Sequence, residues 1–258
     1  MPSGLPILKQ AAVAGSTGDY RVSFTFPAAS ADLAIPQLRL LLSTWIDLGT
    51  HGGFPHSRAA GDFPPAVRLA GEFHQDDTYV ARVLARSIDP RAFQLIRNMA
   101  GRLSLQGIDV RSVVVEEHGE TGEQLRVPIP SEDNESNVYP GLSPHLAFGV
   151  EFEDAEWSKL RRCLVQLRST VQPQHVMGIS EWIRPWVASL EAGAYALPVG
   201  LPGEVHSAGG FTAQFDEASI EISVVCFKAS EMGWNTLMNS LDTYARRESI
   251  PLSLVTID

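Results

Sequence analysis

The sequence lacks the features that would assign the chain to a membrane, secreted or disulfide-bonded class. It holds only two cysteines, Cys163 and Cys226, in 258 residues, and two thiols in a chain of this size do not make a disulfide framework. No apolar run approaches the roughly 18–20 residues that a membrane-spanning helix needs. The N-terminal stretch has no basic leader followed by a long apolar core, so it makes a poor signal peptide. We therefore expect a soluble, cytoplasmic protein.

Short catalytic and cofactor motifs are also missing. The chain has no H-E-x-x-H, no G-x-S-x-G and no C-x-x-C, and its glycine-bearing stretch at 201–210 lacks the lysine and the following helix of a phosphate loop. We therefore predict no cofactor, and the balance favours a protein without enzymatic activity. A site assembled on the face of a sheet would, however, leave no local motif.

Basic residues are scarce relative to acidic ones. Thirty acidic side chains against 20 basic ones give a formal net charge of −10, which repels nucleic acids and anionic membranes and favours cationic partners. Sheets that bind RNA usually stack bases on aromatic residues of their central strands. Here Tyr20, Phe24 and Phe26 share the apolar side of the first expected strand. We therefore expect a basic protein partner, and neither nucleic acid nor membrane.

What the sequence does contain is a hydrophobic pattern that repeats. At 44% hydrophobic residues the chain is globular. In the first half the pattern predicts strands over 20–27, 67–74, 79–86 and 108–117, with helices from Pro36 to Gly49 and from Asp89 to Gly107. In the second half it predicts strands over 146–152, 211–215, 220–227 and 252–257. Three helices are expected in this half. The first is capped by Asp154 and carries the apolar stripe Trp157, Leu160, Leu164 and Leu167. The second is a short helix around 186–190, and the third is capped by Ser230.

The same order of elements in both halves predicts an internal duplication. Strand, helix, hairpin, helix and strand in that order correspond to the α+β ferredoxin-like unit, βαββαβ. We expect a first unit over 1–117 with an insertion at 50–65, and a second over 145–258 with an insertion at 170–209. The segment 118–144 between them is rich in proline and acidic residues, which is typical of a linker.

Strand alternation predicts which side chains lie on the sheet face that the helices leave open. The expected set in the first half is Arg21, Ser23, Thr25, Arg68, Glu72, His74, Arg82 and Arg86, with Arg111 depending on register. The expected set in the second half is His145, Glu151, Thr212, Gln214, Glu221 and Ser223. The two faces could be solvated, could meet as a pseudo-dimer around a polar interior, or could join in one long sheet.

The pseudo-dimer arrangement resembles the dimeric α+β barrels, whose interior often holds a small-molecule site. A pocket of that kind would use His74, Arg82, Arg86, His145 and Glu221, with a histidine as general base. An enclosed volume of roughly 300 Å³ or more into which these side chains converge would favour this function.

Two further groups of residues are candidate sites. His51, His56 and Asp62 lie close together on one loop and could hold a divalent metal, although a surface or packing role is the simpler interpretation. Trp182, Trp186 and Tyr195 are the aromatic residues best suited to bind a partner if they are exposed. The alternative is that they close a small satellite core under a long loop.

Two functions from different classes follow. The first is a non-enzymatic protein-binding module, an acidic inhibitor or immunity-type protein that masks a basic partner. The second is a small-molecule enzyme or binder with a polar pocket between two sheets.

Overall fold

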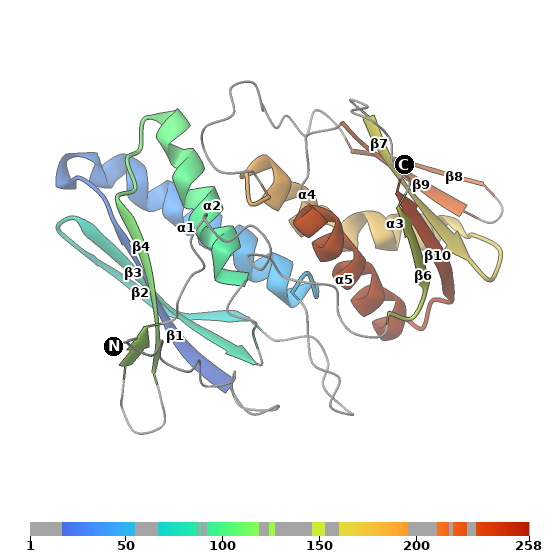
Figure 1. The fold of residues 1–258 in the computed structure, drawn as a ribbon, viewed down its shortest axis with the longest axis horizontal. Helices are drawn as coiled ribbons and strands as arrows, with labels where there is room; N and C mark the ends of the chain where they lie inside the picture. Colours follow the sequence, from blue (N-terminus) through green and yellow to red (C-terminus); the bar gives the residue numbers. More distant parts are fainter. Residues whose placement is uncertain are drawn as a thin grey trace, which may run out of the picture.

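The chain folds into a mixed α+β structure with two sheets on the outside and helices between them (Figure 1). The computed structural model describes residues 17–54, 67–86, 88, 92–118, 124–126, 146–152, 160–195, 211–216, 219–225 and 231–257. Buried residues of both halves belong to a single hydrophobic core cluster.

The first sheet is built around β1, whose alternating pattern faces the core on one side. Its strands are β1 (Thr17–Thr25), β2 (Arg68–Gln75), β3 (Thr78–Arg86), β4 (Ser112–His118) and β5 (Gln124–Arg126), in the order β2-β3-β1-β4-β5. Tyr20, Val22 and Phe24 of β1 are buried under α1 (Ala31–Thr50) and α2 (Ala92–Arg102), and a 3-10 turn, η2 (Leu103–Gln106), follows α2. The short β5 lies inside the expected linker and pairs with β4.

The second sheet has its own helices on one face. Its strands are β6 (Gly149–Phe152), β7 (Leu160–Leu167), β8 (Phe211–Phe215), β9 (Ser219–Val225) and β10 (Leu252–Ile257), in the order β6-β10-β7-β9-β8. The helices are α3 (Pro173–Trp182), α4 (Arg184–Glu191) and α5 (Glu231–Arg247). Apart from β5 and β6, the strands lie side by side as β2-β3-β1-β4 in the first sheet and as β8-β9-β7-β10 in the second. Numbered by their order in each half, these two arrangements are the same, and all neighbouring strands in them are antiparallel.

The prediction of a helix through Leu160 and Leu167 is wrong, because this segment is strand β7. Cys163, Val165 and Leu167 are buried while Leu164 and Gln166 between them are partly exposed, which is the period of two of a strand. Short apolar runs fit both periods, so spacing alone could not decide. Asp154 and Trp157 lie outside the described residues. The first helices of this half, α3 and α4, lie within the predicted insertion instead.

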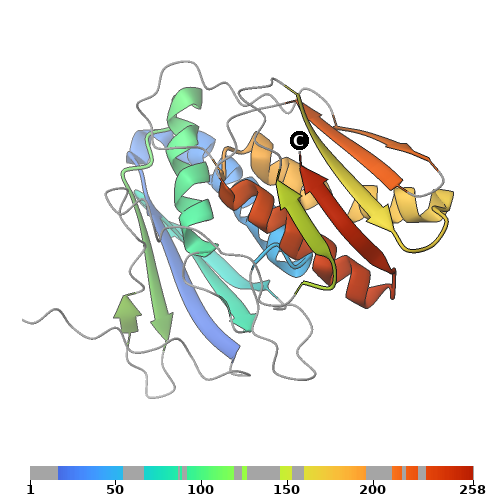
Figure 2. The ribbon, with the colours of Figure 1, turned by 45° about the vertical axis from the view of Figure 1, so that its right-hand side comes forward.

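The helices of the two halves pack against one another, so the open faces of the sheets point away from each other (Figures 1 and 2). Helix α1 contacts α4, and α4 in turn contacts α5. This corrects the two arrangements in which the sheets face each other as a pseudo-dimer or join in one sheet. Among the described residues, helices rather than open sheet faces occupy the space between the sheets.

Helix α5 lies at the centre of this packing. Every residue from Gly233 to Ala245 is buried, including Asn239, Asp242 and Thr243. Several of these polar groups bond to backbone outside the helix: Asn239 Nδ2 donates to the Gly53 carbonyl at 3.5 Å, and Asp242 Oδ1 accepts from the Ala147 amide at 2.6 Å. The Gly53 carbonyl is thus a backbone group of the first half that contacts this polar side.

The cysteines and the helices can be compared with the expectation of neither a disulfide framework nor a membrane-spanning helix. Cys163 is a buried free thiol, and Cys226 lies outside the described residues. Within the same ranges, no helix combines the length and the apolar character needed to cross a bilayer.

The contact between the halves predicts a specific effect of Gly52→Ala. Gly52 has φ +75° and a β-carbon there would overlap the Thr243 side chain of α5, so we expect a loss of about 2–5 kcal/mol in the free energy of unfolding. The control is Gly107→Ala, where φ is +78° but no atom lies within 4 Å of the new β-carbon; the expected loss is about 1–2 kcal/mol. Urea denaturation measures both, and equal losses would contradict the close contact with α5.

Candidate functional site

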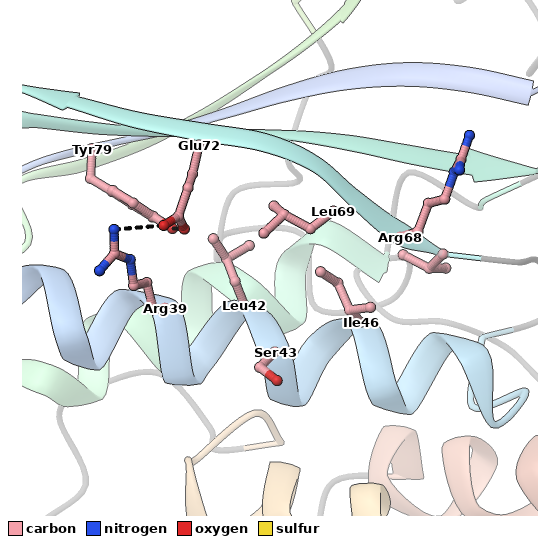
Figure 3. Close-up of a pocket in the computed structure, with 9 residues that line it drawn as sticks. Arg39, Leu42, Ser43, Ile46, Arg68, Leu69, Glu72 and Tyr79 are labelled. Carbon is pink, nitrogen blue, oxygen red and sulfur yellow. Dashed lines mark hydrogen bonds and ion pairs between the residues drawn. The ribbon is translucent and has the colours of Figure 1, made fainter.

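A groove of about 360 Å³ lies between α1 and the edge strand β2 of the first sheet (Figure 3). Leu42 and Ile46 of α1 form one wall, and Val67 and Leu69 from the strand side form the other. Polar side chains line the rest of the groove: Arg39, Ser43, Arg68, Glu72 and Tyr79.

Helix α1 can line this groove because it uses a different part of its circumference for the core. Leu38, Leu41 and Trp45 are buried, and the Trp45 indole donates to the Ala92 carbonyl at 2.8 Å. Arg39 and Ile46 are seven residues apart, two helical turns, and so lie on one side of the helix, toward β2. The groove wall is therefore fixed by the same packing that holds the core.

A β-bulge in β2 sets which of its side chains face α1. Leu69 pairs with Val83 and Glu72 with Ala81, so three residues of β2 span two of β3. Val83 and Ala81 are buried on the helix side, and Leu69 and Glu72 share that side. The prediction that Glu72 and His74 lie on the open face is therefore wrong, because the extra residue reverses the alternation.

Glu72 is held in a small charged cluster at one end of the groove. Tyr79 Oη donates to Glu72 Oε2 at 2.5 Å, and Arg39 Nη2 lies 2.6 Å from Glu72 Oε1. The hydrogen bond from Tyr79, assisted by Arg39, lowers the pKa of Glu72 below its ordinary value. Burial raises the pKa of Tyr79, which keeps its hydroxyl protonated as a donor. Glu72 is thus a stable carboxylate, each of whose oxygens already has one partner.

Strand β2 itself is exposed along its whole length. All eight of its residues are exposed, and β3 is its one strand neighbour within the described residues. Leu69 is 43% exposed and Phe73 is 55% exposed. Phe73 shares the open face with Arg21, whose guanidinium carbon lies 5.8 Å from the ring centroid. Among the described strands, β2 therefore presents a backbone edge without a strand partner, with apolar side chains on both faces.

The structure does not bring the expected pocket residues together. His74 faces α1 at the edge of the first sheet, whereas Arg82 lies on the open face and binds Asp19 with Nε–Oδ1 2.8 Å. This bond with Arg82 lowers the pKa of Asp19. Glu221 lies on the open face of the other sheet, where Ser223 Oγ donates to it at 3.1 Å. Arg86 is placed only by its pairing with Thr17, and His145 lies outside the described residues.

His51 lies between the halves. Its ring centroid is 4.7 Å from that of Trp182, and its carbonyl accepts from the Trp182 indole at 3.0 Å. His56 and Asp62 lie outside the described residues. In the part of the chain that the structure describes, no group of three metal-binding side chains forms. The contacts of His51 are those of a packing residue.

The three aromatic candidates also lie among the helices. Trp186 and Tyr195 are 0% and 1% exposed, and the Trp186 indole donates to the Gly233 carbonyl of α5 at 2.7 Å. Trp182 is partly buried and donates to the Ser240 carbonyl at 2.9 Å as well as to His51. The exposure that partner binding by Trp186 and Tyr195 would require is absent, and all three residues pack against α5.

Sequence reasoning missed the groove because it assigned β2 an uninterrupted alternation. Gly71 was the available signal, since an isolated glycine within a strand pattern often marks a bulge. A bulge at this point would have moved Glu72 to the side of Arg39.

Comparisons with known proteins identify no family for the chain. No model of a protein family matches it, and no curated protein matches it. One solved structure to which it is similar is a mutant chlorite dismutase from Candidatus Nitrospira defluvii, which is 8% identical. The match covers 91% of this chain and 87% of that chain with a TM-score of 0.19. A TM-score this low does not indicate a shared fold, so no activity or cofactor follows from the likeness.

The cluster predicts how the pKa of Glu72 responds to Tyr79→Phe. Loss of the hydroxyl donor should raise this pKa toward its ordinary value of 4.5. Because the folded-state pKa is lowered, the cluster stabilises the fold at neutral pH, and this contribution is lost as the pH falls through the lowered pKa. A carbon-detected NMR titration of the Glu72 carboxyl measures the change.

Tyr20→Phe is the matched control for this titration, because Tyr20 bonds a different carboxylate, Glu117. It should leave the Glu72 pKa unchanged. A Glu72 pKa that is the same in wild type and Tyr79→Phe would show that the hydroxyl does not hold the carboxylate.

Proposed function

We propose that the chain is a tandem of two ferredoxin-like units that acts as a non-enzymatic protein-binding module. The shared strand order of the two sheets, with a hairpin between two helical segments in each half, supports the tandem assignment. Binding takes place at β2, where an extended segment of the partner adds a strand to the first sheet.

The observation that carries this proposal is the exposed edge of β2 beside an apolar groove. An exposed edge strand offers a row of unpaired N–H and C=O groups that another extended chain can match. Among the described edge strands, β2 has eight residues, whereas β5 has three, β6 four and β8 five. The groove next to β2 adds a place for an apolar side chain, which a bare edge lacks.

The charged groups of the groove fit binding better than acid–base catalysis. A general base works best when its pKa lies near the working pH, but the pKa of Glu72 is lowered. The groove passes the lower limit of roughly 300 Å³ expected of a ligand site, yet Arg82 and Glu221 of the predicted pocket lie on open faces away from it. Both observations favour the protein-binding function over the small-molecule enzyme.

The net charge supports an acidic inhibitor or immunity-type protein that masks a basic partner in the cytoplasm. A formal charge of −10 attracts a cationic protein over distance and raises its association rate. In this proposal the overall charge guides the encounter, and the contacts at β2 fix the complex.

Leu69→Lys tests the binding surface. A lysine at this position would place a charge in the groove beside an incoming strand, which opposes strand addition. Because Leu69 is exposed, the substitution should change the free energy of unfolding by less than about 1 kcal/mol. Proteins recovered from native lysate at near-stoichiometric amounts by the wild type should be lost with Leu69→Lys. The control is Leu105→Lys, at a leucine of η2 that is 75% exposed and does not line the groove.

The control variant should recover the same proteins as the wild type. Equal recovery by wild type and both variants would contradict binding at β2. Failure of the wild type to recover any partner would contradict the protein-binding proposal as a whole.

A further inference from the structure

We infer that the segment docked at β2 carries an acidic side chain two positions from an apolar one. This rests on the proposed function and deepens it, because it specifies the chemistry of the docked segment. The inference follows from the register of the bulge and from the charges at the two ends of the groove.

The bulge fixes the spacing. Leu69 and Glu72 are three residues apart in β2, but their partners Val83 and Ala81 are two apart in β3. On its other edge a regular strand would run past the same two positions with residues i and i+2, which point to one face. Two consecutive inward side chains of the added strand would therefore lie beside Leu69 and beside Glu72.

The position beside Leu69 selects an apolar side chain. There the groove is walled by Ile46, Leu42 and Val67, and Figure 3 shows Leu69 pointing toward Leu42 and Ile46 of α1. Leu69 is 43% exposed. An apolar side chain from the partner would therefore remove from water both the surface of Leu69 and its own surface. A polar side chain would find the Ser43 hydroxyl in the lining, while the Tyr79 hydroxyl already donates to Glu72.

The position beside Glu72 selects a carboxylate. Both Glu72 oxygens already accept, from Tyr79 and Arg39, and its side chain is 27% exposed. The Arg39 side chain is 54% exposed and carries five N–H donors, more than its bonds to this cluster use. An added carboxylate can bond the outer side of this guanidinium.

The charges around the strand point the same way. Two guanidiniums, Arg39 and Arg68, and one carboxylate, Glu72, line the groove. Figure 3 shows the Arg68 side chain on the far side of β2 from α1, so it adds positive potential without occupying the groove. A net positive site on a chain of formal charge −10 is complementary to an acidic segment.

Selection from a random peptide library against the full chain tests this inference. Peptides retained by the wild type should be enriched in an apolar residue separated by one residue from Asp or Glu. Replacing that acid by its amide in a selected peptide should weaken binding about threefold to fivefold, as for an exposed ion pair, measured by fluorescence anisotropy. The same replacement should have no effect on binding to Arg39→Gln.

The outcomes separate the two levels of the proposal. The carboxylate inference would be overturned by peptides that bind the wild type but not Leu69→Lys and show no preference for an acid. It would also be overturned by an acid preference that persists in Arg39→Gln. Both outcomes would leave strand addition at β2 intact. Peptides that bind Leu69→Lys as well as the wild type, or no retained peptide at all, would overturn docking at β2. A wild-type dimer that Leu69→Lys converts to monomer would assign the edge to a second copy and also overturn the inference.

Discussion

The burial of helix α5 on every side is the constraint on which the rest of the structure depends. A helix that carries Asn239 and Asp242 inside a core must find bonds for them, because an unpaired buried polar group costs about 1–3 kcal/mol. The second sheet can cover only one side of α5. The end of α1 and the turn after it cover another, through the Gly53 carbonyl and the indole of Trp182 that bridges His51 and Ser240.

The position of α5 determines which surfaces stay free. With the helices of both halves turned inward, each sheet has one face turned away from them (Figures 1 and 2), and β2 is an edge strand among the described strands. On the first open face Arg82 and Asp19 bind each other. At β2 the backbone edge has no such partner among the described strands, and the groove against α1 lies next to it. The docking that we propose would take place at this edge.

The sequence predicted well where a single period dominated. Clean alternation gave β1, the helical stripe through Trp45 gave most of α1, and both hairpins were found. Helix α1 begins at Ala31 rather than at Pro36, because the proline is exposed and solvent can satisfy the carbonyl left without its N–H. Strand β7 was missed because Leu160, Leu164 and Leu167 have helical spacing, whereas its buried side is formed by Cys163, Val165 and Leu167. The bulge in β2 was missed because one extra residue shifts every later side chain. The inward packing of the helices has no local signature, since it depends on contacts such as Trp182 with His51, 131 residues apart.

Native-state hydrogen exchange on the full chain tests the account most directly. If α5 is enclosed by both halves, amides in the segment 233–245 should exchange only through global unfolding, while amides of β2 exchange orders of magnitude faster through its open edge. That pattern would support one packed body with a free edge strand. Exchange of the α5 amides as fast as those of β2 would show that the halves separate readily, and it would contradict the packing from which the docking edge follows.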